Sequence, residues 1–277
     1  MNLSDQIDAL DPGDVGVLGL PFDANSSFRQ GPAMGPVRIR EAYRSSSGNA
    51  FSEAGVDLEK SNAWRFLDDL SWPGPELDLT CVERTVDQVL SRDARLVTLG
   101  GDHSITYPIV RAFARRHPEL TILHLDAHPD LYHVLDGNPL AHACPFARIM
   151  EEGLVRRLVQ VGIRTLTAHQ REQARRFGVD ILPVDKWVTA RQLEFDGPVY
   201  LSLDLDCLDP AFAPGVSHHE PGGLTTREVL QIIQEFKGPL VGADIVELNP
   251  ERDWMDMTAR VAAKLLKEIL GRMLGAV

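Results

Sequence analysis

Residues 121–130 read TILHLDAHPD, a short, largely apolar run followed directly by a cluster of polar side chains. Short apolar runs rich in β-branched residues are typical of strands buried in a parallel sheet covered by helices. Ligands of such sheets bind beyond the carboxyl ends of the strands. The stretch therefore predicts an element of the fold and, in Asp126, His128 and Asp130, a place for chemistry.

Similar runs recur along the chain, and stretches of helical period separate them. We predict strands at residues 15–20, 95–99, 121–125, 158–163, 199–205 and 240–246. We predict helices at residues 37–44, 79–91, 105–116, 143–152, 168–177, 226–236 and 256–273. This alternation predicts an α/β fold, with three α/β/α layers, doubly wound around a mostly parallel sheet. Because no repeat or linker divides the chain, we predict one domain over residues 1–277.

Two local signals refine this prediction. Thr225 and Glu228, three residues apart before an apolar-periodic stretch, have the form of a capping box and mark a helix start. The stretch 206–223 is too long for a simple connection, and long loops of this kind are often functional.

Composition narrows the class of protein. The chain has 40 acidic against 28 basic residues and a formal charge of −12, which argues against binding to nucleic acid or to an anionic membrane. No run approaches the roughly 18 apolar residues of a membrane span. Its three cysteines lack CxxC spacing, and the first 14 residues resemble neither a signal nor a transit peptide. We expect a cytoplasmic protein.

Polar side chains follow four of the predicted strands. They are His103, the 126–130 cluster, Asp204 with Asp206, and Glu247. Residues i and i+2 of an extended chain project to the same side, about 7 Å apart, and a bend at Pro129 would turn Asp130 inward.

Carboxylates gathered this closely cannot all remain ionised unless cations neutralise them. Two divalent cations would do so, and a carboxylate-rich set with some imidazole suits Mn²⁺ or related metals. The alternative is that each Asp caps a loop and each His fills a polar niche. Three independent segments at strand ends favour the metal site.

Three neighbouring residues have two interpretations each. His124 either supports Asp126 or is an ordinary buried histidine, and Asp244 either supports the site or caps backbone. Asp102 either orients the loop or a ligand beside it, which we expect, or is itself a direct ligand.

Several motifs together resemble those of a known family. GGDHS (100–104), DAHPD (126–130), SLDLDCLDPAFAPG (202–215) and DIVELNP (244–250) resemble the ureohydrolase signatures shared by arginases and agmatinases. LGLPFDANSSFRQGPA from residue 18, FARIMEEG from residue 146 and SHHEPGGLTTRE (217–228) are similar to plant-type arginases, which are agmatinase-like. The resemblance runs from about residue 15 to the C-terminal helix.

The resemblance implies an arginase-like fold and a site for two Mn²⁺ ions, or other divalent metals, in each subunit. One metal would be held by His103, Asp126, Asp130 and Asp204. The other would be held by Asp126, His128, Asp204 and Asp206.

The implied reaction is hydrolysis of a small cationic guanidino substrate to urea and an amine. Asp130 would accept a hydrogen bond from the attacking hydroxide, and Glu247 would pair with the guanidinium group in bidentate geometry. His142 aligns with the family's proton-shuttle histidine, which would protonate the leaving amine. The family also implies a homo-oligomer, a trimer or hexamer.

The tail of the substrate is less constrained. Asn138 and His218 are the candidates for contacting it, and His142 and Glu247 complete the predicted substrate contacts. Animal-type arginases carry an acid just after the strand that ends near Arg164, and that acid is absent here. We expect hydrolysis of L-arginine to L-ornithine and urea, with agmatine or another guanidino acid as alternative substrates. A non-catalytic metal-binding member of the fold is the remote alternative.

Overall fold

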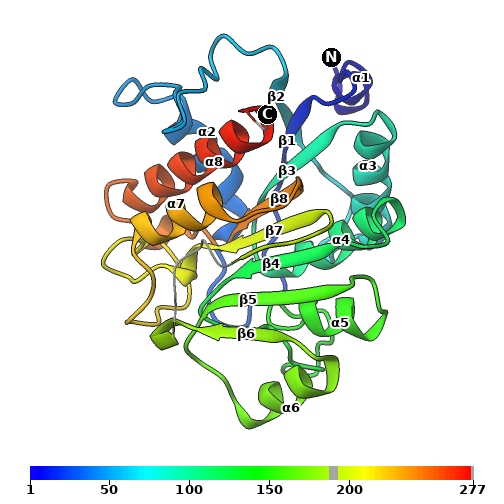
Figure 1. Cartoon of the computed structure of the whole chain (residues 1–277), viewed down its shortest axis with the longest axis vertical. Helices are drawn as coiled ribbons and strands as arrows, with labels where there is room; N and C mark the ends of the chain where they lie inside the picture. Colours follow the sequence, from blue (N-terminus) through cyan, green and yellow to red (C-terminus); the bar gives the residue numbers. More distant parts are fainter. Residues whose placement is uncertain (187–192, 276–277) are drawn as a thin grey trace.

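A computed structural model describes residues 1–186 and 193–275, and an eight-stranded sheet forms its centre (Figure 1). The strand order is β2-β1-β3-β8-β7-β4-β5-β6, and every pairing among the described strands is parallel. The strands are β1 (Val15–Leu20), β2 (Trp64–Asp69), β3 (Arg95–Gly100), β4 (Thr121–Leu125), β5 (Arg157–Ile163), β6 (Asp180–Pro183), β7 (Val199–Asp204) and β8 (Leu240–Val246).

Helices cover both faces of the sheet (Figure 1). One buried cluster joins the sheet to α2 (Gly35–Tyr43), α7 (Thr226–Glu235) and α8 (Met257–Gly275). A second cluster, on the other face, includes residues of α1 (Leu3–Asp8), α3 (Leu79–Ser91), α4 (Thr106–Arg116), α5 (Pro145–Glu151) and α6 (Ala168–Phe177). The predicted three-layer α/β/α fold is confirmed.

The six predicted strands and seven predicted helices are all present, with ends within two residues of those expected. Strands β2 and β6, at the two edges of the sheet, were not predicted. β2 is buried at only one of its six residues and β6 at none, because an edge strand has a neighbour on one side only. Neither edge strand therefore needs the continuous apolar pattern of the central ones.

Capping residues explain where two helices begin. The predicted box at α7 is present: Glu228 N donates to Thr225 Oγ1 (3.2 Å), and Thr225 N donates to the Glu228 carboxylate (2.7 Å). Thr167 and Gln170 form the same arrangement at α6. Each box satisfies backbone N–H groups that have no partner within the helix.

The insertion of β8 and β7 between β3 and β4 matters for function. It brings the carboxyl ends of these four central strands next to one another. These are the strands that the sequence analysis found to be followed by polar side chains. No helix in the described part of the chain is both long and apolar enough to cross a membrane.

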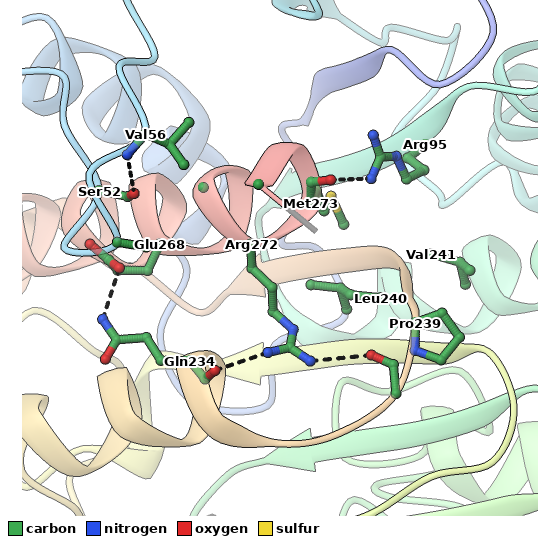
Figure 2. Close-up of a pocket in the computed structure, with 14 residues that line it drawn as sticks. Ser52, Val56, Arg95, Gln234, Pro239, Leu240, Val241, Glu268, Arg272 and Met273 are labelled. Carbon is green, nitrogen blue, oxygen red and sulfur yellow. Dashed lines mark hydrogen bonds between the residues drawn. The ribbon is translucent and has the colours of Figure 1, made fainter. Parts of the chain in front are cut away.

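A cavity of about 580 Å³ lies at the opposite, amino-terminal ends of the strands, beside the starts of β3 and β8 and the end of α8 (Figure 2). The Arg272 guanidinium reaches across it and donates to the carbonyl oxygens of Gln234 (3.0 Å) and Gly238 (3.2 Å). Arg95 donates to the carbonyl oxygen of Met273. None of the predicted site residues lines this cavity.

Candidate active site

The predicted polar residues lie together at the carboxyl ends of the four central strands. Each residue lies at the end of its strand or in the turn that follows, and all but His128 are buried. They are His103 in the 3₁₀ turn after β3, Glu247 after β8, Asp204 and Asp206 at the end of β7, and Asp126, His128 and Asp130 after β4.

His103 faces three carboxylates. Its Nδ1 atom lies 3.0 Å from an oxygen of Asp130, 3.2 Å from Asp204 and 3.3 Å from Asp126. Although this nitrogen is fully buried, it has no hydrogen-bond partner of acceptable geometry. One nitrogen and three oxygens thus converge, as the ligands of a bound cation do.

The other nitrogen of His103 shows which one carries the hydrogen. Nε2 lies 3.0 Å from Ser202 Oγ, and Ser202 donates its own hydrogen to Asp244 (2.8 Å). Ser202 can therefore only accept from Nε2–H, and this leaves Nδ1 as the nitrogen that can present a lone pair to a cation among the carboxylates. Asp244 also accepts from the hydroxyls of Tyr200 and Thr106, so it supports His103 through Ser202.

A second group of ligand atoms adjoins the first. His128 Nδ1 lies 3.1 Å from Asp206 and 3.4 Å from the other oxygen of Asp126. The atoms of these three side chains lie close enough to hold a metal ion. Asp126 therefore contributes one oxygen to each group, which is the arrangement of a ligand that bridges two metals.

The pKa shifts of two of these carboxyl groups also support a metal site. Burial and the neighbouring charges of Asp206 and Asp126 raise the pKa of Asp204 well above its usual range. Burial and the charge of Asp126 raise the pKa of Asp206 to about 6. Without cations Asp204 retains its proton and Asp206 is harder to ionise than usual, so the donor set fits divalent metal ions.

His124 supports Asp126 and is not itself free to bind a metal. Its Nε2 lies 2.8 Å from an oxygen of Asp126, and Gln160 Nε2 donates to its Nδ1 (3.0 Å). The same Gln160 nitrogen donates to the carbonyl oxygen of Pro129 (2.7 Å), which fixes the orientation of the amide. His124 thus donates to Asp126, although its position alone would also suit a ligand.

His142 lies between two hydrogen-bond partners, Glu247 and Ser27, beside the carboxylates. Its Nδ1 is 3.3 Å from Glu247 Oε1, and its Nε2 is 2.8 Å from Ser27 Oγ. Burial lowers the pKa of His142, but the hydrogen bond and charge of Glu247 outweigh it and raise the pKa to about 9. The ring of His218 stacks on that of His142, with centroids 5.0 Å apart.

Two of the predicted site residues have left-handed backbone. Asp130 has φ 47° and Glu247 has φ 66°, a conformation uncommon for residues other than glycine. The bend after Pro129 directs the Asp130 carboxylate toward His103. Such backbone is often retained at functional sites, where the surrounding structure enforces it.

Asp102 orients two segments, as expected. One carboxylate oxygen accepts from Asn25 N (3.0 Å) and the other from Ser104 N (3.0 Å). It thereby joins the loop that carries Ser27 to the turn that carries His103.

A cavity of about 230 Å³ opens onto the carboxylates. His142, His218 and Glu247 line it, whereas Asn138 does not. Both ends of the Asn138 amide are bonded within the loops: Nδ2 donates to Asn25 Oδ1 (3.0 Å), and Oδ1 accepts from Leu140 N (2.9 Å).

Five further lining residues are not among the predicted site residues: Ser27, Tyr132, Leu135, Ala143 and Gln170. Ser27 lies within the motif that begins at residue 18, so its position was detectable. Gln170 was detectable only through its spacing from Thr167, because nothing in the sequence shows that α6 borders the site.

Comparisons with known proteins agree with this geometry. The sequence profile of the arginase family matches residues 13–271. Arginase 1, mitochondrial, of Oryza sativa subsp. indica is 46% identical over 274 residues, covering 93% of this chain and 81% of the relative. The human mitochondrial guanidino acid hydrolase is 36% identical over 274 residues, covering 93% and 77%. The structure of an arginase from Medicago truncatula superposes with a TM-score of 0.90 at 41% identity, covering 98% of this chain and 91% of that one.

The fold and the site together define a hydrolase of the ureohydrolase class, acting on guanidino or amidino groups. The chain belongs to the arginase family.

Proposed function

We propose that the protein is a binuclear-metal amidinohydrolase that converts L-arginine to L-ornithine and urea. The observation that carries the proposal is the buried Nδ1 of His103, which lacks a hydrogen-bond partner and faces three carboxylates at 3.0–3.3 Å. The resemblance of the whole chain to plant arginases supports arginine as the substrate.

The residues would divide between two Mn²⁺ ions, as the sequence analysis expects. His103, Asp126, Asp130 and Asp204 would hold one, and Asp126, His128, Asp204 and Asp206 the other. When bound, the metals supply a nucleophile from water at neutral pH and neutralise developing charge.

The remaining groups would act on the substrate. Glu247 is a buried carboxylate at the cavity wall. It can therefore pair with the guanidinium of the substrate and orient the guanidinium carbon toward the other carboxylates. His142 is placed to deliver a proton to the leaving amine, because Glu247 keeps its ring protonated at neutral pH. Asp130 would orient the attacking water.

Gln170 favours a substrate whose tail carries a carboxylate. Its Oε1 accepts from Thr167 N (3.2 Å) and Thr167 Oγ1 (3.0 Å), which leaves the Nε2 hydrogens for the cavity that Gln170 lines. The carboxylates lining the cavity are Asp130, Asp204, Asp206 and Glu247, all of which have roles at the reacting end. A tail amide donor suits arginine or another guanidino acid better than agmatine, whose tail is an ammonium.

The direct test is urea release from arginine, agmatine, guanidinobutyrate and guanidinopropionate by Mn²⁺-loaded protein. We expect the largest kcat/KM for arginine. Asp206→Asn should abolish turnover and leave the fold intact. No turnover of any guanidine by metal-loaded wild-type protein would refute the proposal and favour a non-catalytic metal-binding role.

We further propose that residues 1–277 act as a single domain in a homo-oligomer, a trimer or hexamer, in the cytoplasm. The free state of Cys81, Cys144 and Cys207 suits a reducing compartment. Light scattering of the purified protein tests the assembly, and cell fractionation tests the compartment.

A further inference from the structure

Arg164 is surrounded by backbone carbonyl groups rather than by carboxylates. It follows β5 directly, and its guanidinium contacts the turn that ends β7. Nη2 donates to the carbonyl oxygens of Asp206 (2.7 Å) and Leu208 (3.3 Å), and Nη1 donates to that of Cys207 (3.2 Å). Three consecutive peptide carbonyls around a proposed metal ligand are therefore fixed by one side chain.

The same guanidinium also holds a second loop. Nε and Nη2 both donate to the carbonyl oxygen of Glu220, at 2.8 and 2.6 Å. Glu220 lies two residues beyond His218, which lines the cavity. Gly223 lies so close that a Cβ there would be 2.8 Å from Nη2, so this loop packs directly against the guanidinium.

The backbone of Arg164 completes the connection. Its N–H donates to the carbonyl oxygen of Ala127 (3.0 Å), which lies between the proposed ligands Asp126 and His128. Ala127 N in turn donates to Asp206 Oδ1 (3.1 Å). Arg164 therefore contacts three segments: the one after β4, the one after β7 and the loop that carries His218.

The residue type matters, because only arginine offers several donors in a rigid planar fork. Lysine has the same charge, but its three donors radiate from one atom and cannot reach the Glu220 and 206–208 carbonyls together in this geometry. The hydrogen bonds of the Arg164 guanidinium go to backbone carbonyls, and the charge of Asp209 acts on it from further away.

We propose that Arg164 is a positioning residue that aims the Asp206 carboxylate at the second metal and holds the 217–223 loop over the cavity. The proposal rests on the proposed metal-dependent function. Asp206 belongs to only one of the two proposed ligand sets, so the loss of Arg164 should weaken one metal site and spare the other.

The experiment compares Mn²⁺ binding to metal-free wild type, Arg164→Lys and Arg171→Lys by titration calorimetry and electron paramagnetic resonance. Arg171 is the matched control, because its guanidinium donates to the carbonyl oxygen of Leu166 (3.2 Å) and contacts none of the three segments. Loss of a residue that orients a ligand typically weakens metal binding by about 10–100-fold. We expect that loss at one site of Arg164→Lys, less than about twofold change at the other, and replacement of the coupled two-manganese spectrum by that of a single ion.

Thermal unfolding of the metal-free proteins separates positioning from folding. Arg164→Lys should unfold close to the wild-type temperature, and its KM for arginine should rise because the 217–223 loop is released. Two sites of wild-type affinity in Arg164→Lys, or equal weakening of both sites, would overturn the inference. A wild-type protein that binds no Mn²⁺ would instead overturn the proposed function.

Arg164→Gln provides the same comparison if the lysine variant does not fold. If both variants unfold without metal while Arg171→Lys folds, Arg164 is required for the fold itself and the inference is wrong.

Discussion

The Nε2 atom of His103 lies 3.0 Å from Ser202 Oγ, and this contact determines which nitrogen of the ring carries hydrogen. Ser202 donates to Asp244, so it must accept from His103. Nδ1 is then the nitrogen directed at the carboxylates, and its lone pair would serve a metal that displaces the proton held there. Orienting contacts of this kind commonly tune metal affinity.

Ser202→Ala should therefore weaken metal binding. Without the hydroxyl, Nε2–H loses its acceptor and the other tautomer becomes accessible. We expect the affinity for Mn²⁺ to fall by about 10-fold, at the lower end of the usual effect. Titration of the metal-free protein measures it, with Ser91→Ala as control because the Ser91 hydroxyl donates to the carbonyl oxygen of Gln88 within its own helix. Equal affinity in the two variants would contradict the tautomer assignment.

Metal binding should release protons near pH 7. In the metal-free site, the pKa of Asp204 is raised well above its usual range by burial and neighbouring carboxylates. Burial lowers the pKa of His128, but the charge of Asp206 and the contact with Asp126 raise it to about 12. Both groups hold protons that a cation must displace, so affinity should increase as pH rises. Calorimetry in buffers of different ionisation enthalpy should show net release; a buffer-independent heat would count against this.

His142→Asn should lose activity but keep its metal. A general acid contributes typically about 10²–10⁴-fold to a rate, and His142 is not among the proposed ligands. In the wild-type enzyme, the acid form is lost as pH rises through a pKa near 9, so kcat should fall on the alkaline side. Metal content by elemental analysis and kcat against pH provide the measurements. His117→Asn, at the far end of α4, is the control; metal loss in the His142 variant would show that the assignment is wrong.

Gln170→Glu should shift preference toward agmatine. The carboxylate retains the capping box with Thr167 but replaces the amide donor in the cavity by a negative charge. We expect the ratio of kcat/KM for agmatine to that for arginine to rise by about 10-fold, which corresponds to about 1.4 kcal/mol. Gln88→Glu, an exposed change on α3, adds the same charge elsewhere. An unchanged ratio would exclude Gln170 from the tail site.

Much of the fold follows from local pattern. The six inner strands are buried on both faces, so most of their residues are apolar, and this makes all six readable from the sequence. The edge strands β2 and β6 face solvent and carry no such pattern. A strand whose pairing is decided mainly by its neighbour cannot be recognised from its own residues.

The sequence by itself determined the candidate site residues: His103, Asp126, Asp204 and Glu247 each follow an apolar run, and strand ends are where parallel sheets present polar side chains. Only the tertiary structure decided which of them meet. β8 and β7 insert between β3 and β4, residues of distant segments become neighbours, and the carbonyls of residues 206–208 and 220 converge on Arg164. Such contacts join residues far apart in the chain, and spacing along a sequence contains no record of them.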